Sequence, residues 1–186
     1  QLVGRDDELS ARNRERLRII QSSGDHLLGL INDVLDLARV EAGRIELRPA
    51  PFSLRELLRD LEASFAPRAA ERGLQLSVSV ESVPADPVLG DRQRLRQVLE
   101  NLLGNAVKFT RQGSVRLEVR PSPGGAPGVD RDRWRFRVVD TGPGLTEADQ
   151  SRLFQPFSQP GQAPAGEAGA GLGLAISREL AANHGG

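Results

Sequence analysis

Apolar residues recur at alternating steps of three and four in the first part of the chain, and this spacing restricts the fold more than any other feature. The residues that follow it are Leu17, Ile20, Gly24, Leu27, Ile31, Val34 and Ala38. Such a repeat is the seam of a coiled coil or helix bundle, so we expect a helix over residues 10–42 with one buried face. The next step falls on Glu41, and Gly43 ends the helix.

Further apolar residues lie on this helix outside the seam. They are Leu28, Leu30, Leu35 and Leu37. A single partner helix would cover only the seam. The extra residues therefore favour a four-helix bundle made by dimerisation over a lone helix packed against a domain.

Short strands and helices alternate after Gly43, which indicates a globular domain over residues 44–186. We expect strands at 45–47, 74–80, 114–120 and 134–139, and helices at 53–72, 91–109, 146–153 and 172–183. Ser53 and Glu56 form a capping box, and the turn residues of 121–128 predict a long hairpin loop. This order predicts an α+β fold, a two-layer α/β sandwich with a mixed sheet, preceded by one long helix of a dimeric four-helix bundle.

The composition excludes several classes of function. The 186-residue chain has 25 basic and 25 acidic residues, so no net field draws it to nucleic acid or to an anionic membrane surface. It has no cysteine, which excludes disulfides, thiolate zinc sites and cysteine nucleophiles. No apolar run approaches the ~18 residues of a membrane span. Because the chain starts at Gln1 and contains no methionine, we expect it to be a piece of a longer protein.

Three polar residues share one face of the helix expected at 91–109. Asn101, Asn105 and Lys108 are spaced by four and three, so they can converge on one ligand. An ordinary solvated face explains most such stripes. Asn is a poor helix former, however, and two at one-turn spacing need a reason. An amide oxygen aimed at Mg²⁺, with Lys108 beside a phosphate, would supply one.

Two glycine-rich loops follow that helix. The first, DTGPG at 140–144, places the Asp140 carboxylate at the end of a strand, where a purine amine would suit it and glycines admit a flat ligand. The second, GAGLG at 169–173, opens into the last helix, whose free N–H groups and dipole can hold phosphates. Taken alone, a tight turn explains the first loop and a flexible linker the second. The second loop fits neither a Walker loop nor the dinucleotide-binding fingerprint.

In this order, the elements resemble those of sensor histidine kinases. The segment GDRQRLRQVLENLLGNAVKFT at 90–110 is similar to their N box, 140–144 to the first glycine box, LFQPF at 153–157 to the F box, and 169–173 to the second glycine box. The segment LLGLINDVLDLARVEAG at 27–43 is similar to the second helix of their dimerisation hairpin. The resemblance implies two domains, that hairpin helix at 1–43 and a catalytic ATP-binding domain of the Bergerat fold at 44–186.

The resemblance also implies a site for ATP and Mg²⁺. Asn105 would coordinate Mg²⁺, Asn101 and Lys108 would contact the phosphate and metal region, and Asp140 would bind the adenine amine. The remaining nucleotide contacts would come from Phe109, Gly142, Gly144, Gly169, Gly171, Gly173 and Leu174.

A two-component role follows from the same resemblance. The parent protein would phosphorylate its own histidine as a homodimer and pass the phosphoryl group to a response-regulator receiver domain. It would act in the cytoplasm or as the cytoplasmic part of a membrane-bound sensor. Related ATPases of the gyrase, Hsp90 and MutL kind carry a glutamate general base where this chain has Asn101. An amide cannot take a proton from water, which favours phosphoryl transfer over hydrolysis.

Three departures from the family pattern keep two alternatives open. The phosphoacceptor histidine belongs to a hairpin helix that this chain lacks, and we interpret His26 and His184 as structural. Residues 158–170 contain no Lys or Arg, and Ala170 stands where many relatives have Thr. The final strand hairpin of the family is also missing. The alternatives are a non-catalytic nucleotide-sensing or dimerisation module and, disfavoured by Asn101, a hydrolysing ATPase.

Overall fold

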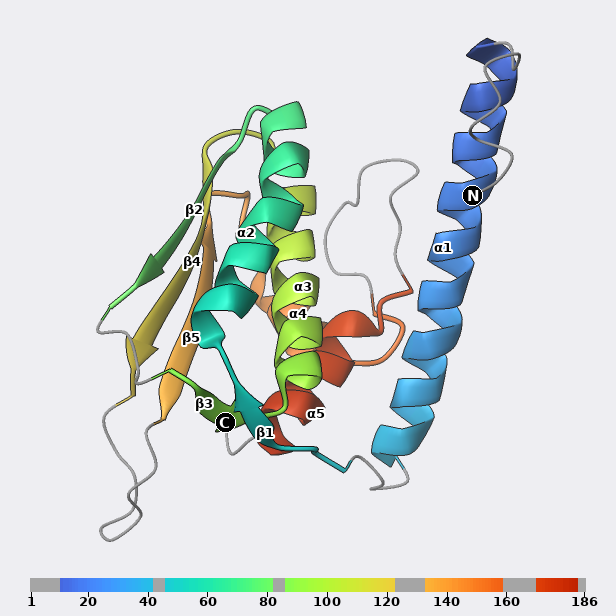
Figure 1. Ribbon diagram of the computed structural model, residues 1–186. Coiled ribbons are helices and arrows are strands. Elements are labelled where there is room, and N and C mark those ends of the chain that lie inside the picture. The colour runs from blue at the N-terminus through green and yellow to red at the C-terminus, as the bar shows by residue number, and fades with distance from the viewer. Residues whose placement is uncertain (1–10, 42–45, 82–85, 123–132, 159–169, 184–186) are drawn as a thin grey trace, which may run out of the picture. The chain divides into compact units, whose positions relative to one another are not determined.

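The computed structural model describes residues 11–41, 46–81, 86–122, 133–158 and 170–183 (Figure 1). The chain divides into two compact units, Gln1–Arg44 and Ile45–Gly186. The first unit holds the long helix α1 (Ala11–Glu41), as the seam predicts. Large apolar side chains of this helix are exposed in the single chain, namely Ile20, Leu27, Leu28, Ile31, Val34 and Leu35.

The described residues of the second unit form five strands in two sheets. A small antiparallel ladder pairs β1 (Ala50–Phe52) with β3 (Val88–Gly90). The main sheet has the order β2-β4-β5, formed by β2 (Gln75–Val80), β4 (Ser114–Pro121) and β5 (Trp134–Asp140). β2 runs parallel to β4, and β4 runs antiparallel to β5. The predicted mixed sheet is thus confirmed.

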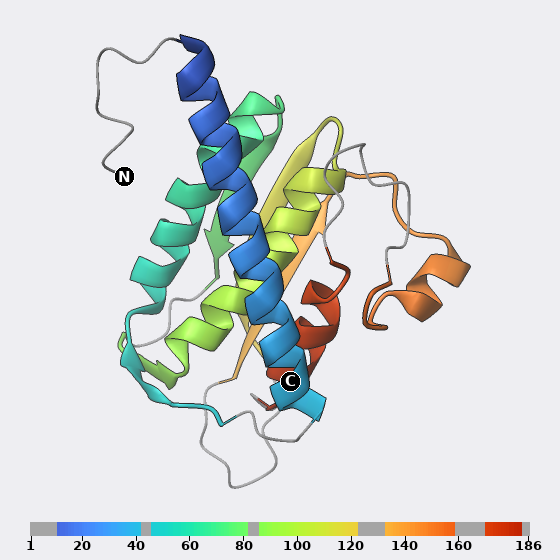
Figure 2. The same ribbon diagram turned by 90° about the vertical axis from the view of Figure 1, so that its right-hand side faces the viewer.

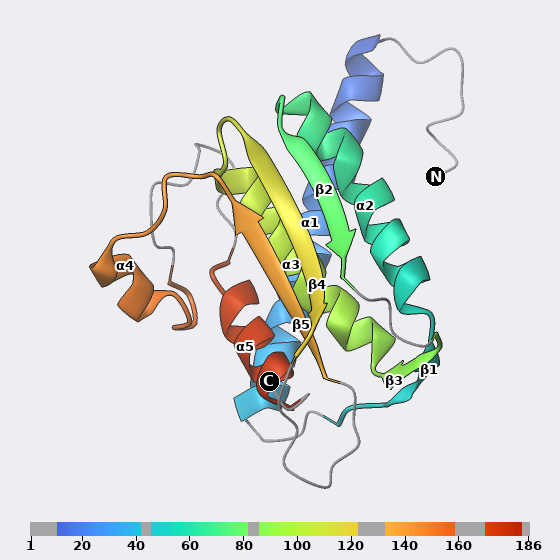
Figure 3. The same cartoon turned by 90° about the vertical axis from the view of Figure 1, so that its left-hand side faces the viewer.

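Helices cover one face of the main sheet. They are α2 (Leu54–Glu71), α3 (Arg92–Phe109) and α5 (Gly173–Asn183), and the short α4 (Glu147–Arg152) projects beside them. In Figure 2, α3 (yellow-green) lies between α2 (teal) and α5 (red). Figure 3 looks onto the opposite face of the sheet, which no described helix covers. The predicted two-layer α/β sandwich is therefore confirmed.

The core lies between the sheet and α2 and α3. Val115, Leu117 and Val119 of β4 are fully buried, whereas the alternating Arg116 and Arg120 are exposed. The helices meet this face with apolar side chains from successive turns, namely Leu57, Leu61, Phe65, Leu99 and Leu103. Burial of each such side chain contributes about 1.5–3 kcal/mol, so the helix layer holds α3 firmly against the sheet.

Two side-chain caps set the helix starts that the sequence predicts. Ser53 accepts a hydrogen bond from the Glu56 backbone N–H at 3.2 Å and starts α2. Asp91 starts α3, because its Oδ1 accepts from the Arg94 N–H at 3.0 Å. Its other oxygen, Oδ2, accepts from the Arg48 N–H at 2.9 Å. Asp91 therefore also ties the segment before β1 to the start of α3.

The strand predicted at 45–47 is wrong. Residue 45 lies outside the described residues, Glu46 and Leu47 form no strand, and β1 begins at Ala50. The Pro-rich sequence around Pro51 reads as a loop, but an edge strand tolerates a proline, and β1 pairs on one side only. β3 was not expected from the sequence. The predicted hairpin loop falls mainly on residues outside those described.

None of the described helices combines the length and the apolar character needed to cross a bilayer.

Candidate functional site

Two asparagines one turn apart on α3 are linked to each other and to α5. Asn101 Nδ2 donates to Ser177 Oγ at 2.8 Å, and Asn105 Nδ2 donates to Asn101 Oδ1 at 3.4 Å. Both asparagines are half-buried and Ser177 is buried. Asn105 Oδ1 has no hydrogen-bond partner within the described part of the chain. One amide oxygen on this face is therefore available to a ligand.

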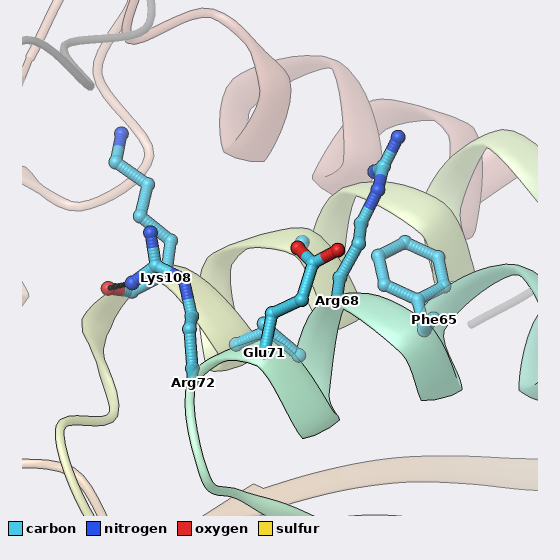
Figure 4. A pocket seen from close by; sticks show the side chains of 7 residues that line it. Phe65, Arg68, Glu71, Arg72 and Lys108 are labelled. Carbon is cyan, nitrogen blue, oxygen red and sulfur yellow. Dashed lines mark hydrogen bonds between the residues drawn. The ribbon is translucent and has the colours of Figure 1, made fainter.

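Lys108 lies at the border between this face and a depression beside α2. Its Nζ lies 4.9 Å from the centre of the Phe109 ring, and its carbonyl oxygen accepts from Arg72 Nη1 at 3.3 Å. Figure 4 shows the depression, whose volume is about 270 Å³. It is lined by Phe65, Arg68, Glu71, Arg72, Gly104, Val107 and Lys108. The asparagines do not line it, so the hollow is separate from the amide face.

The first glycine loop begins where β5 ends. Asp140 is exposed, and its Oδ1 accepts from the Gly142 N–H at 2.8 Å. A Cβ atom on Gly142 would lie 2.6 Å from that oxygen, so a larger residue would displace the carboxylate from this bond. Thr141 Oγ1 accepts from the Ser114 N–H and donates to the Gln112 carbonyl, each at 3.0 Å. These bonds fix the loop against the start of β4.

Thr110 carries a buried hydroxyl next to this loop. The residue is 1% exposed, and its Oγ1 has no hydrogen-bond partner within the described residues. It lies 3.5 Å from the position that a Cβ on Gly142 would take. A buried hydroxyl without a partner costs about 1–3 kcal/mol. A polar ligand held between Asp140 and Thr110 would satisfy it.

The second glycine loop packs against the Ser158 carbonyl group and the Asn101 side chain. Gly171 has a φ of 70°, and a Cβ there would lie 2.5 Å from the Ser158 carbonyl oxygen. A Cβ on Gly173 would lie 2.2 Å from Asn101 Oδ1. This loop is therefore in direct contact with the asparagine face, and it leads into the first turn of α5.

α3 connects the two loops. Asn101 lies against Gly173 of the second loop, Thr110 lies beside Gly142 of the first, and Asn105 is between them along α3. The nine helical steps from Asn101 to Thr110 span ~13 Å, which suits an extended nucleoside triphosphate with its base at Asp140 and its phosphates between Asn105 and the second loop. The residues thus fit this class of ligand by length, by the glycine clearances and by the unpartnered Thr110 hydroxyl.

A cation at this site would depend on few protein ligands. No group of three or more His, Asp or Glu side chains that could hold a metal occurs within the described ranges. Mg²⁺ usually keeps waters and takes one or two protein oxygens plus substrate phosphates. Asn105 Oδ1 fits that requirement as a single protein oxygen.

The residues that the sequence singles out fall into small groups in the structure. Asn101 and Gly173 are in contact, as are Asp140 and Gly142, and Phe109 lies beside Lys108. Three other predicted residues have these placements: Gly144 is exposed with a φ of 72°, Leu174 is half-buried on α5, and Gly169 lies outside the described residues.

Sequence reasoning did not single out Thr110 and Ser177 as parts of the candidate site. Thr110 follows the helix as an ordinary C-cap residue, and its sequence carries no sign that the hydroxyl is unpaired. Ser177 is a lone polar residue in the run LGLAIS at 172–177, and this interruption of an apolar stretch was the available signal.

Comparison with protein families gives two matches. The histidine kinase-, DNA gyrase B- and HSP90-like ATPases match residues 90–186, and the His kinase A phospho-acceptor domain matches residues 1–43. The virulence sensor protein BvgS of Bordetella pertussis is 45% identical over 170 residues, which are 90% of this chain and 13% of BvgS. The signal transduction histidine-protein kinase BarA of Escherichia coli K12 is 38% identical over 180 residues, 96% of this chain and 19% of BarA. The chain therefore spans under a fifth of these relatives.

Solved structures agree with the sequence matches. Full-length ShkA in complex with AMPPNP has a TM-score of 0.75 at 43% identity, covering 96% of this chain and 35% of ShkA. The nucleotide-free catalytic domain of the histidine kinase ThkA has a TM-score of 0.58 at 25% identity, covering 74% of this chain and 83% of that domain.

Proposed function

The chain belongs to the family of histidine kinase-, DNA gyrase B- and HSP90-like ATPases and carries the catalytic ATPase domain of a histidine kinase, and from this premise we propose that it binds Mg-ATP between α3 and the two glycine loops. The proposal places the adenine at Asp140 and the phosphates between Asn105, Lys108 and the start of α5. When bound, Mg-ATP supplies the γ-phosphoryl group and the metal charge that neutralises the phosphates.

The observation that carries the proposal is the unpartnered amide oxygen of Asn105. Its nitrogen is engaged by Asn101, so the oxygen is the atom left to face a ligand. Lys108 lies on the same helix three residues later and adds a positive charge beside the phosphates. The AMPPNP bound by ShkA, at 43% identity to this chain, supports a nucleotide at the corresponding domain.

The adenine end of the proposed site rests on Asp140 and Thr110. Asp140 Oδ2 has no hydrogen-bond partner among the residues described, so it can accept from the adenine amine. The buried Thr110 hydroxyl can meet a ring nitrogen directly or through a water. The remaining proposed contacts are Phe109, Gly142, Gly144, Gly169, Gly171, Gly173 and Leu174.

Phosphoryl transfer is favoured over hydrolysis by the residue one turn before Asn105. Asn101 is an amide with its nitrogen bonded to Ser177 and its oxygen bonded to Asn105. It therefore has no basic atom to accept a proton from water. Positioning and charge neutralisation suffice for transfer to a protein acceptor.

For the whole protein we propose autophosphorylation on a histidine, followed by transfer to a response-regulator receiver domain. The match of residues 1–43 to the phospho-acceptor domain supports such a hairpin, and the exposed apolar face of α1 supports a homodimer. We propose a cytoplasmic position for this part of the protein.

A second candidate is a nucleotide-sensing module that does not transfer phosphate. The observation in its favour is that residues 158–170 carry no Lys or Arg, which leaves Lys108 as the proposed phosphate cation. Such a module would bind ATP but label no protein.

Incubation of the full-length protein with γ-labelled ATP tests these functions. Acid-labile, base-stable label on the protein would support the kinase, and free phosphate alone would support an ATPase. Bound nucleotide with neither product would support the sensor. Calorimetric titration of the 186-residue chain with AMPPNP and Mg²⁺ tests the site itself. Asn105→Ala and Asp140→Ala should each weaken binding, and unchanged affinity in both variants would refute the site.

A further inference from the structure

We infer that Ser177 is a positioning residue that acts through Asn101 to hold the Asn105 amide with its oxygen toward the cation. The inference rests on the proposed function, because the cation belongs to Mg-ATP. It gives Asn101 a second task beside the phosphate contact implied by the family resemblance. The three residues form a chain of hydrogen bonds from α5 to the middle of α3.

The direction of each bond in this chain fixes the next one. An Asn side chain has a donor end and an acceptor end, and rotation by 180° exchanges them. Ser177 Oγ accepts from Asn101 Nδ2, so Asn101 presents Oδ1 to Asn105. Asn105 must then turn Nδ2 toward Asn101, and its Oδ1 is left on the open side. If Asn101 turned over, Asn105 would present nitrogen to the cation.

The second glycine loop selects the orientation of Asn101. A Cβ on Gly173 would lie 2.2 Å from Asn101 Oδ1 but 3.1 Å from Nδ2, so the oxygen is the amide atom pressed against the glycine. An amide nitrogen in that position would bring two hydrogens into the same contact. The bare oxygen fits, and it can make a weak Cα–H contact. Gly173 thus opposes the inverted amide, and Ser177 accepts the bond that the correct amide donates.

Burial of Ser177 stabilises the first hydrogen bond of this series. Ser177 is 6% exposed, and both asparagines are half-buried. Water competes poorly for a buried bond, so the 2.8 Å link between Asn101 and Ser177 is held more firmly than a bond on a solvated helix face. A serine in a helix can also donate its own proton to the preceding turn, which leaves its oxygen free to accept.

Both polar ends of Asn101 are occupied inside the protein. Each end keeps further bonding capacity, one N–H on Nδ2 and one lone pair on Oδ1, so contact with a phosphate is compatible with both bonds. Ser177 and Gly173 lie on α5, which begins two residues after Gly171. Gly171 in turn packs on the Ser158 carbonyl. A shift of the second glycine loop would consequently change the orientation of the Asn105 amide. The second loop and the proposed cation ligand are coupled through these contacts.

The test compares Ser177→Val with Ser177→Thr in the 186-residue chain. The two side chains have the same shape, so any steric cost is shared and only the hydroxyl differs. Ser177→Ala removes the hydroxyl without adding volume and covers the case in which the larger residues do not fold. Ser151→Ala is the control, because Ser151 is exposed on α4 and its hydroxyl donates to the Ala148 carbonyl of the same helix.

Two readouts are measured. The first is the tightening of AMPPNP binding on addition of Mg²⁺, determined by calorimetry. We expect this tightening to fall about tenfold in Ser177→Val and Ser177→Ala relative to Ser177→Thr, because second-sphere partners typically contribute that much to metal affinity. Binding of AMPPNP without Mg²⁺ should be alike in all variants. The second readout is the NMR signals of the Asn101 and Asn105 side-chain amides in the nucleotide-free chain, which should shift in Val and Ala but not in Thr.

Equal Mg²⁺ tightening in Val, Ala and Thr, or unchanged Asn105 amide signals in Val and Ala, would overturn the inference. Failure of the proposed function would look different. The unaltered chain would then bind no AMPPNP under any condition, and the nucleotide-free spectra would still decide whether Ser177 orients the two amides.

Discussion

The backbone N–H of Gly142 donates to Asp140 Oδ1 at 2.8 Å, and this bond joins the carboxylate to the first glycine loop. One carboxylate oxygen is thereby fixed, and the other has no hydrogen-bond partner within the described chain. The free oxygen is consequently held in one direction at the end of β5. A change at either residue should disturb the orientation of the other.

Asp140→Asn should weaken binding of ATP and remove the preference of the site for ATP over GTP. The amide can keep its oxygen on the Gly142 N–H, but it then presents an NH₂ donor to the adenine amine, which is also a donor. Loss of a hydrogen bond to a charged group costs about 1.5–3 kcal/mol, or roughly 10- to 100-fold in affinity. Competition titrations with ATP and GTP would measure this change. An unaltered ratio of the two affinities would contradict the assignment of the base to Asp140.

Gly142→Ala should reduce nucleotide affinity, whereas Gly104→Ala should not. A Cβ on Gly142 would lie 2.6 Å from Asp140 Oδ1, so the carboxylate must turn away. A Cβ on Gly104 in α3 would meet no atom closer than 4.0 Å. Replacing that helical glycine should raise the free energy of unfolding by up to ~1 kcal/mol.

Calorimetry with AMPPNP and denaturant unfolding of both glycine variants would separate these effects. Equal affinity in the two variants would remove the argument that Gly142 clears space for Asp140. A destabilised Gly104 variant would show that α3 has less room than its geometry indicates.

Local sequence signals predicted the elements whose cause is local. Ser53 and Asp91 each mark a helix start because a short polar side chain accepts from the N–H groups of the next turn. The strand around Pro51 could not be predicted in this way. Its existence depends on pairing with Leu89 and its neighbours, which lie far along the chain.

The residues of the candidate site also divide into those that local spacing predicts and those that depend on tertiary packing. Spacing alone placed Asn101 and Asn105 on one face of a helix, because that relationship needs only the helical repeat. The partner of Asn101 is Ser177, which is 76 residues away. No periodicity connects them, and only the packing of α5 against α3 brings them together. The unpaired state of Thr110 likewise follows from tertiary packing alone.

Thr110→Val should stabilise the chain and weaken nucleotide binding. Valine has nearly the same shape and removes a buried hydroxyl that has no partner in the described structure. Removal of such a group should raise the free energy of unfolding by about 1 kcal/mol. The same change deprives the base of a hydrogen-bonding group, so AMPPNP affinity should fall severalfold.

Denaturant unfolding and calorimetry of Thr110→Val and Thr110→Ser would check the expected rise in stability and the expected fall in AMPPNP affinity. Serine keeps the hydroxyl and should retain the affinity. A less stable Val variant with unaltered AMPPNP binding would show that the hydroxyl is satisfied inside the protein and has no part in the site.

Ile31→Asp should weaken self-association of the chain, and the adjacent Asn32→Asp should not. Ile31 belongs to the apolar seam of α1 and is 48% exposed in the single chain, whereas Asn32 is an exposed polar residue outside the seam. Neighbouring helical residues point about 100° apart, so the two substitutions add the same charge to different faces. A carboxylate in the seam would lose the apolar burial of isoleucine, about 1.5–3 kcal/mol for each copy, and would itself be desolvated. Sedimentation equilibrium over a range of concentrations should show a dissociation constant at least about tenfold higher for Ile31→Asp, and equal constants in the two variants would indicate that this face of α1 makes no contact between copies.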